Sequence, residues 1–103
     1  MEIKAVFFDI DGTLVNDSRM VLKSTEKAIR ALKEQGIFVG LATGRGPFFV
    51  RPFIERYDFD FAVTYNGQYI FTKDKILSAS PIDKKNLRLL IEYAKKHRIE
   101  IAL

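Results

Sequence analysis

Three short apolar runs lie in the first two-thirds of the chain. They are Ile3–Phe8, Ile37–Ala42 and Phe61–Tyr65. Short, nearly continuous apolar runs are typical of strands that are buried on both faces of a parallel sheet. We therefore expect three buried strands.

The stretch between the first two runs has the apolar spacing of a helix. We expect this helix from about Thr25 to Gln35, with Ser24 as its N-cap and Gly36 as its end. Its predicted apolar stripe consists of Ala28, Ile29 and Leu32.

A second helix is predicted from Pro47 to Tyr57, after the loop Thr43–Gly46. Pro52 lacks a backbone donor, so we expect a kink or a late start. The residues expected to pack inward are Phe49, Val50, Phe53, Ile54 and Tyr57, and Phe48 is also expected to serve packing. Strands that alternate with helices indicate a doubly wound α/β fold with a parallel sheet, because right-handed crossovers make the strands parallel.

The pattern changes after Asn66-Gly67. A short hairpin is predicted from Gln68–Thr72 and Lys75–Ser80, around Lys73-Asp74. Asp83 can cap a further helix that runs to about Lys96, with an apolar face formed by Leu87, Leu90, Ile91 and Ala94. Ile99–Leu103 is predicted to be one more strand.

Composition narrows the class of protein. The chain has 103 residues, 48% of them hydrophobic, which suits one small folded domain. It has no cysteine, which excludes disulfides and thiolate metal sites and is compatible with a cytoplasmic setting. No apolar run approaches the ~20 residues of a membrane span, and the first residues lack the layout of a signal peptide. The net charge is +4, with a local basic excess in Lys84–Arg98 that we interpret as a solvated helix face rather than a nucleic-acid site.

Polar residues follow each of the three predicted strands. Asp9 and Asp11 follow the first, Thr43 the second and Asn66 the third. Ligands of parallel α/β sheets bind beyond the carboxyl ends of the strands, so these side chains should meet at one rim.

Two carboxylates this close indicate a cation between them, since they otherwise repel each other. Mg²⁺ favours oxygen ligands and binds one or two carboxylates together with a substrate phosphate. A calcium loop of the EF-hand type does not fit. Counted from Asp9, the position that requires glycine holds Leu14, and the position of the bidentate glutamate holds Met20.

Three motifs together resemble the haloacid dehalogenase superfamily of phosphohydrolases. Asp9–Thr13 after a buried strand resembles its first motif, and Leu41–Arg45 at the end of the second strand resembles its second. Tyr65–Gly67 followed by a hairpin is similar to the Cof-type branch, the sugar-phosphate phosphatases with a large inserted cap. The P-type pumps match poorly, because their aspartate is followed by lysine where this chain has Ile10.

The resemblance implies a role for each motif residue. Asp9 would be the nucleophile that accepts the phosphoryl group, and Asp11 the general acid and then the base. Mg²⁺ would bind the Asp9 side chain and the Asp11 backbone carbonyl. The Thr43 hydroxyl and the amides of Gly12 and Gly44 would hold phosphate oxygens.

Some of these residues also have simpler interpretations. Arg45 could be a phosphate or substrate contact or a surface arginine. Asn66 with Gly67 could contact substrate or only set the hairpin geometry. Asp11-Gly12 and Thr43-Gly44 could each be ordinary turns.

Two parts of the family site are not found in this sequence, namely a later lysine and a second acidic motif. The resemblance therefore implies the amino-terminal part of a longer enzyme, with a Rossmann-like core and hairpin in 1–82 and the start of an inserted α/β cap in 83–103. It implies Mg²⁺-dependent hydrolysis of small phosphate esters through an aspartyl phosphate. The alternatives are a non-catalytic phosphate- or Mg²⁺-binding module that needs a partner chain, and a phosphomutase of the same superfamily.

In the family's strand order the first strand lies mid-sheet. With neighbours on one side only, Ile3–Phe8 would be an open edge, and we expect self-association there.

Overall fold

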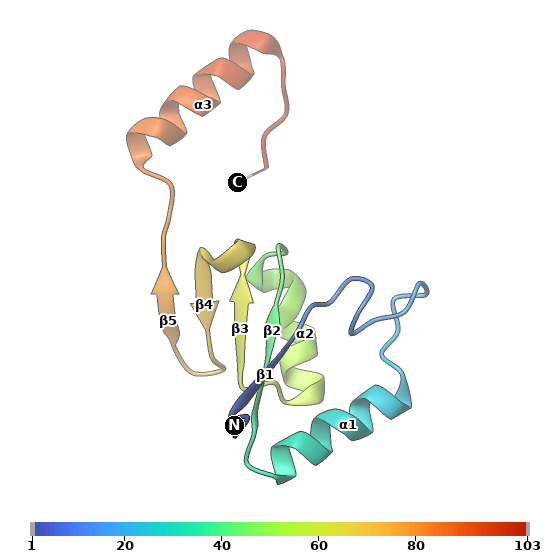
Figure 1. Ribbon diagram of the computed structural model, residues 1–103. Coiled ribbons are helices and arrows are strands. Elements are labelled where there is room, and N and C mark those ends of the chain that lie inside the picture. The colour runs from blue at the N-terminus through green and yellow to red at the C-terminus, as the bar shows by residue number, and fades with distance from the viewer. Residues whose placement is uncertain (1, 103) are drawn as a thin grey trace.

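The computed structural model describes residues 2–102 and contains one five-stranded sheet in the order β1-β2-β3-β4-β5 (Figure 1). The strands are β1 Ala5–Phe8, β2 Phe38–Ala42, β3 Phe61–Thr64, β4 Tyr69–Phe71 and β5 Ile76–Ala79. The helices are α1 Lys23–Glu34, α2 Pro47–Tyr57 and α3 Lys84–His97, with a short 3₁₀ turn, η1, at Tyr65–Gly67.

The sheet is mixed. β1, β2 and β3 are parallel, with Val6 beside Val39 and Leu41 beside Ala62. β4 and β5 add an antiparallel hairpin to β3. This arrangement confirms the predicted α/β class, the three parallel strands and the hairpin, although both hairpin strands are shorter than expected.

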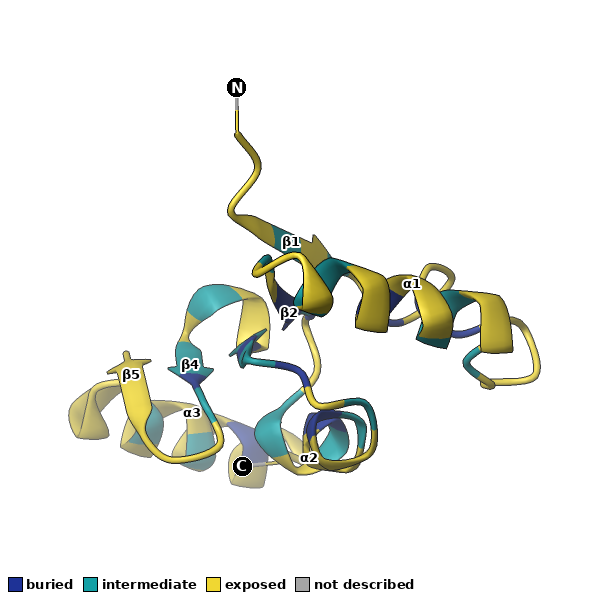
Figure 2. Ribbon diagram, turned by 90° about the horizontal axis from the view of Figure 1, so that it is seen from below, coloured by how far each residue is buried: buried dark blue, intermediate teal, exposed yellow. Residues whose placement is uncertain are grey.

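The core lies between the sheet and two helices. Both crossovers step in the same direction along the sheet, so right-handed connections place α1 and α2 on the same face. Ile29 of α1 and Val50 and Ile54 of α2 are buried there against the sheet residues Val39 and Leu41. Figure 2 shows this buried zone around β2 and α2, whereas β5 and most of α3 are exposed.

The other face of the sheet is open. Phe7 is 53% exposed and Phe38 is 60% exposed, and both lie on the face that α1 and α2 leave uncovered. The prediction that the first strand is buried on both faces is therefore wrong. β1 is an edge strand, and within residues 2–102 no helix packs on its outer face.

The start of α1 differs from the prediction. The helix begins at Lys23 after Leu22, no side chain caps it, and Ser24 is not the N-cap. A local bridge between Val15 and Val21 immediately precedes the helix, and the chain enters α1 directly after it. The expected end is confirmed, since Gly36 has a φ of +77° just after the helix.

Side-chain burial on α1 and α2 also departs from two expectations. Ala28 is exposed and does not join the buried stripe, and Phe48 is 93% exposed and packs little. α2 begins at Pro47 and continues past Pro52, so a late start is also wrong. Proline is well suited to the first position of a helix, which explains the early start.

α3 lies beyond the carboxyl ends of the parallel strands and does not pack on either face of the sheet (Figure 1). Asp83 caps it as predicted, by accepting a hydrogen bond from the Lys85 amide at 3.1 Å. Residues 99–102 form no strand, which contradicts the expected strand over its described part, and Leu103 lies outside the described residues. In the part of the chain that the structure describes, no neighbouring strand pairs with 99–102.

The division of the chain at residue 82 stays a prediction. No helix within residues 2–102 is both long and apolar enough to cross a membrane.

Candidate functional site

The turn after β1 explains why one isoleucine separates two acids. Ile10 is fully buried, so the residues on either side of it point outward, and both Asp9 and Asp11 are exposed. Backbone hydrogen bonds close the turn, among them those from the Leu14 amide to the Asp9 carbonyl at 3.0 Å and from the Val15 amide to the Ile10 carbonyl at 3.1 Å. The apolar anchor thus fixes the acids at the end of the strand.

Gly12 is required in this turn for its backbone conformation. Its φ is +76°, which L side chains rarely adopt, and a Cβ there would meet no atom within 4 Å.

The three strand ends share one hollow. It has a volume of about 320 Å³ and is lined by Asp9, Ala42, Thr43, Gly44, Val63, Asn66 and Gly67. Asp9, Thr43 and Asn66 therefore meet at the rim where the strand order places them. Asp11, Gly12 and Arg45 do not line the hollow. Asp11 and Gly12 lie in the adjoining turn.

The loop after β2 is held by hydrogen bonds on both sides. The Thr43 amide donates to the Val63 carbonyl at 2.9 Å, and the Thr43 hydroxyl accepts from the Arg45 amide at 3.1 Å. Thr43 is 7% exposed. Its hydroxyl is thus fixed at the edge of the hollow with a proton of its own to donate.

Arg45 binds Asp11. Its guanidinium donates to both carboxylate oxygens, at 2.9 and 3.1 Å, and lies 4.1 Å above the centre of the Phe49 ring. These hydrogen bonds hold the pKa of Asp11 below its ordinary value. In this arrangement the side chain of Arg45 faces a carboxylate, and its predicted contact with phosphate stays a prediction.

The oxygen atoms at the rim are of the type that Mg²⁺ prefers as ligands. Asp9 supplies an exposed carboxylate and the Asp11 carbonyl is a second hard oxygen, which is the chemistry that Mg²⁺ prefers. They form only part of a shell, because within residues 2–102 no group of three or more acidic, histidine or cysteine side chains could hold a metal. Water and a substrate phosphate commonly fill the other positions around Mg²⁺.

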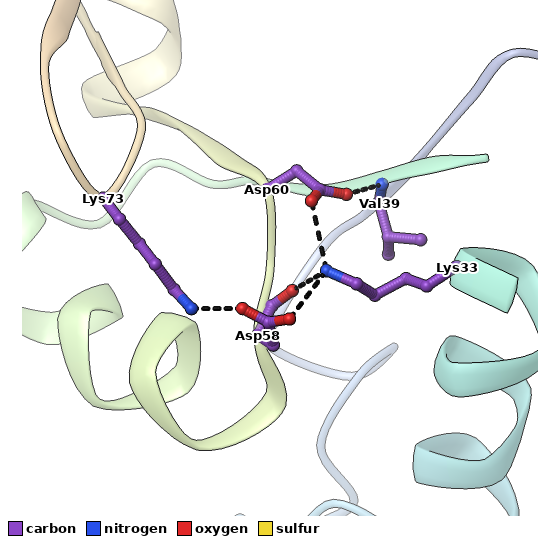
Figure 3. Close-up of polar contacts among 5 residues, drawn as sticks. All are labelled: Lys33, Val39, Asp58, Asp60 and Lys73. Carbon is purple, nitrogen blue, oxygen red and sulfur yellow. Dashed lines mark hydrogen bonds and ion pairs between the residues drawn. The ribbon is translucent and has the colours of Figure 1, made fainter. Parts of the chain in front are cut away.

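A second polar cluster lies at the amino ends of β2 and β3, opposite the rim, and Figure 3 shows its side chains. Lys33 of α1 reaches Asp58 and Asp60, with its Nζ 3.1 Å from an oxygen of each carboxylate. Lys73 of the hairpin also binds Asp58. Asp60 in turn accepts a hydrogen bond from the Val39 amide at 2.8 Å. Sequence analysis missed this cluster because its members are far apart in the chain and form no motif.

The cluster shifts two pKa values. Burial lowers the pKa of Lys33, but its hydrogen bonds to Asp60 and Asp58 outweigh burial and the net pKa is raised. The hydrogen bond from Lys73, followed by that from Lys33, lowers the pKa of Asp58. Because Lys33 and Lys73 are bound at the amino ends of the parallel strands, neither offsets the charge of Asp9 at the rim.

An α/β core whose parallel strands carry polar side chains at their carboxyl ends is typical of proteins that bind ligands at that rim. Residues 6–103 match the family model of the haloacid dehalogenase-like hydrolases, and the chain belongs to this family. Its fold is accordingly the α/β fold of that superfamily.

Relatives agree with this membership. YkrA of Bacillus subtilis is 34% identical over 94 residues, which cover 91% of this chain and 37% of YkrA. The pyridoxal phosphate phosphatase YbhA of Escherichia coli is 28% identical, with 96% of this chain and 38% of YbhA covered. The chain thus spans less than two-fifths of the length of these relatives.

Solved structures give the same result. A Geobacillus kaustophilus protein superposes with a TM-score of 0.87 at 38% identity, over 93% of this chain and 38% of its own. The subclass IIB sugar phosphatase BT4131 superposes with a TM-score of 0.75 at 31% identity, over 91% of this chain and 38% of its own. Both similarities cover more than nine-tenths of this chain.

Proposed function

We propose that this chain carries the nucleophile of a Mg²⁺-dependent phosphatase that acts on small phosphorylated metabolites. The observation that supports this most strongly is the shared hollow, in which Asp9, Thr43 and Asn66 from three strand ends face one space. Membership in the family and the phosphatase relatives support the reaction type. The cytoplasmic location predicted from the sequence is compatible with a metabolite substrate, and it stays a prediction.

In the proposed reaction, a carboxylate oxygen of Asp9 attacks phosphorus and the ester P–O bond breaks. Asp11 gives its proton to the leaving alkoxide, and the phosphoryl group remains on Asp9. Water then attacks phosphorus as Asp11 takes its proton, which releases phosphate and restores Asp9. To carry that proton, Asp11 must leave Arg45, since their ion pair favours the ionised carboxylate.

The neighbours of Asp9 would hold the phosphate and the metal. The hydroxyl of Thr43 and the amides of Gly12 and Gly44 would bind phosphate oxygens. Mg²⁺, held by the Asp9 carboxylate and the Asp11 carbonyl, would neutralise charge on the transferring group.

By itself the chain should not hydrolyse phosphate esters. The acidic shell at the rim is partial and Lys33 and Lys73 are bound elsewhere. These observations favour the alternative of a phosphate- or Mg²⁺-binding module for the chain on its own. A phosphomutase would use the same Asp9 and Asp11, and no contact in the structure favours it over hydrolysis.

The sheet edge supports a further part of the proposal, namely self-association. Within residues 2–102, β1 has no pairing strand on its outer side, and Phe7 of this strand is half-exposed. Such edges pair with other chains unless charges or prolines discourage it.

A chimera tests the proposed reaction. This chain would replace the matching segment of YkrA, and phosphate release from small phosphate esters would be measured with and without Mg²⁺. We expect Mg²⁺-dependent release that Asp9→Asn abolishes. Asp74→Asn is the matched control, because Asp74 is an exposed aspartate in the hairpin turn. A folded chimera that shows no hydrolysis, or one whose Asp9→Asn variant keeps its rate, contradicts the proposal.

A further inference from the structure

The turn after β3 has an unusual backbone. Tyr65, Asn66 and Gly67 have φ values of +49°, +54° and +96°, so three successive residues are left-handed. Glycine adopts this conformation freely and asparagine tolerates it, but for a large aromatic residue it is unfavourable. A residue held against its preference calls for an explanation in terms of what its side chain does.

The turn is joined to the loop after β2 through its backbone. The Tyr65 amide donates to the Arg45 carbonyl at 3.0 Å, and the Asn66 amide donates to the Thr43 carbonyl at 3.1 Å. Two successive amides of the turn thus bind the loop whose Thr43 hydroxyl and Gly44 amide are proposed to hold phosphate.

The side chains of the turn cover the same loop. A Cβ on Gly46 would lie 2.5 Å from the Tyr65 hydroxyl oxygen and 2.7 Å from the ring carbon that bears it. A Cβ on Gly44 would lie 3.0 Å from the side-chain oxygen of Asn66. Gly46 has a φ of −85°, so its backbone would accept alanine, and it is the Tyr65 ring that leaves no room for a side chain.

We propose that Tyr65 is a positioning residue. Its ring lies over Gly46, and the side-chain amide of Asn66 lies over Gly44. Together the two side chains hold the Thr43–Gly46 loop in one conformation. Gly44 and Gly46 then serve to receive these side chains. This inference rests on the proposed function of the loop, but the effect of Tyr65 on the mobility of the loop can be measured without any ligand.

Hydrogen exchange by mass spectrometry over Thr43–Gly46 is the direct readout on the full chain. Tyr65→Asn removes the ring and places a residue that tolerates the left-handed conformation. We expect exchange in the loop to become about tenfold faster, the equivalent of one lost backbone hydrogen bond. The urea midpoint should stay level or rise, because the unfavourable conformation is relieved. A residue with a merely structural role would lower both protection and stability.

Companion variants make the test specific. Tyr65→Phe keeps the ring and should exchange like the wild type. Gly46→Ala should displace the ring and speed exchange, but should add nothing in the Tyr65→Asn background. Phe48→Ala is the control for the neighbouring helix start, since Phe48 is 93% exposed. Unchanged exchange in Tyr65→Asn, or equally fast exchange in Tyr65→Phe, overturns the proposal.

Inorganic phosphate separates this inference from the proposed function. Phosphate should slow loop exchange in the wild-type chain and should do so at lower concentration than in Tyr65→Asn. If phosphate protects neither chain while Tyr65→Asn still loosens the loop, the positioning role stands and phosphate binding by the loop is contradicted. If phosphate protects both chains at the same concentration, the loop binds phosphate and the positioning role is contradicted.

Discussion

Replacement of Asp60 should destabilise the fold far more than its position before β3 suggests. Asp60 makes two hydrogen bonds with Val39. Its amide donates to the Val39 carbonyl at 2.8 Å, and its carboxylate accepts from the Val39 amide at 2.8 Å. The same carboxylate contacts Lys33 of α1 at 3.1 Å (Figure 3). One side chain therefore extends the β2–β3 ladder and ties a helix to it.

The magnitude follows from burial. Val39 is fully buried, so Asp60→Ala leaves its amide without an acceptor, which costs about 1–3 kcal/mol. The contact with Lys33 is partly exposed and adds about 0.5 kcal/mol. We expect Asp60→Ala to lose about 1.5–3.5 kcal/mol, and Asp60→Asn, which keeps an acceptor oxygen, to lose about 1 kcal/mol or less.

Urea unfolding followed by circular dichroism measures both variants. Glu26→Ala is the control, because it removes an exposed ion pair with Arg30 on α1, and pairs of this kind contribute about 0.3–0.5 kcal/mol. If Asp60→Ala costs no more than Glu26→Ala, the buried Val39 amide is satisfied in another way and the reasoning is wrong. If Asp60→Asn costs as much as Asp60→Ala, the charge on Lys33 dominates instead of the amide.

Three further outcomes are expected. Arg45→Ala should raise the pKa of Asp11 toward its ordinary value in an NMR titration, since Arg45 lowers it; an unchanged pKa means that the ion pair does not form in solution. Asp58 has a folded pKa below its unfolded one, so its contribution to stability is present above about pH 4 and is lost as the pH falls through the folded value. Asp58→Asn should therefore make the free energy of unfolding, measured with urea, depend less on pH in the acid range. An unchanged pH dependence argues against this role of Asp58. Phe7→Lys should reduce self-association at the β1 edge in light scattering at several concentrations, while equal association would place the contact elsewhere.

The order of strands and helices could be predicted because it follows from local patterns. Continuous apolar runs marked the parallel strands, and helical spacing marked Pro47–Tyr57 to the residue. Asp83 could be predicted as the N-cap of α3 because its carboxylate accepts a hydrogen bond from an amide two residues away. Features of this kind depend on neighbours in sequence.

Features that depend on tertiary contacts were not predictable. Burial of β1 on both faces was wrong because hydrophobicity does not show which face a helix covers. Helix α1 begins at Lys23 rather than near Thr25, directly after a bridge between Val15 and Val21 that no spacing rule predicts. The ion pair between Asp11 and Arg45 joins residues from different strand ends, and no spacing rule connects them.

The positions at the rim were predictable for a geometric reason. Residues that follow parallel strands must come together at one edge, so Asp9, Thr43 and Asn66 could be placed near each other from strand order. Their shared hollow agrees with that placement. What each side chain does in a reaction is not fixed by placement, and those roles stay predictions.

The central claim is that Asp9 accepts a phosphoryl group. The most direct measurement is acid quench of the YkrA chimera during turnover of a small phosphate ester, followed by mass spectrometry of the peptide that contains Asp9 and Asp11. We predict a phosphoryl group on Asp9 that is absent from the Asp9→Asn variant. Rapid turnover without any modified peptide, or a phosphoryl group that persists in Asp9→Asn, would contradict this account.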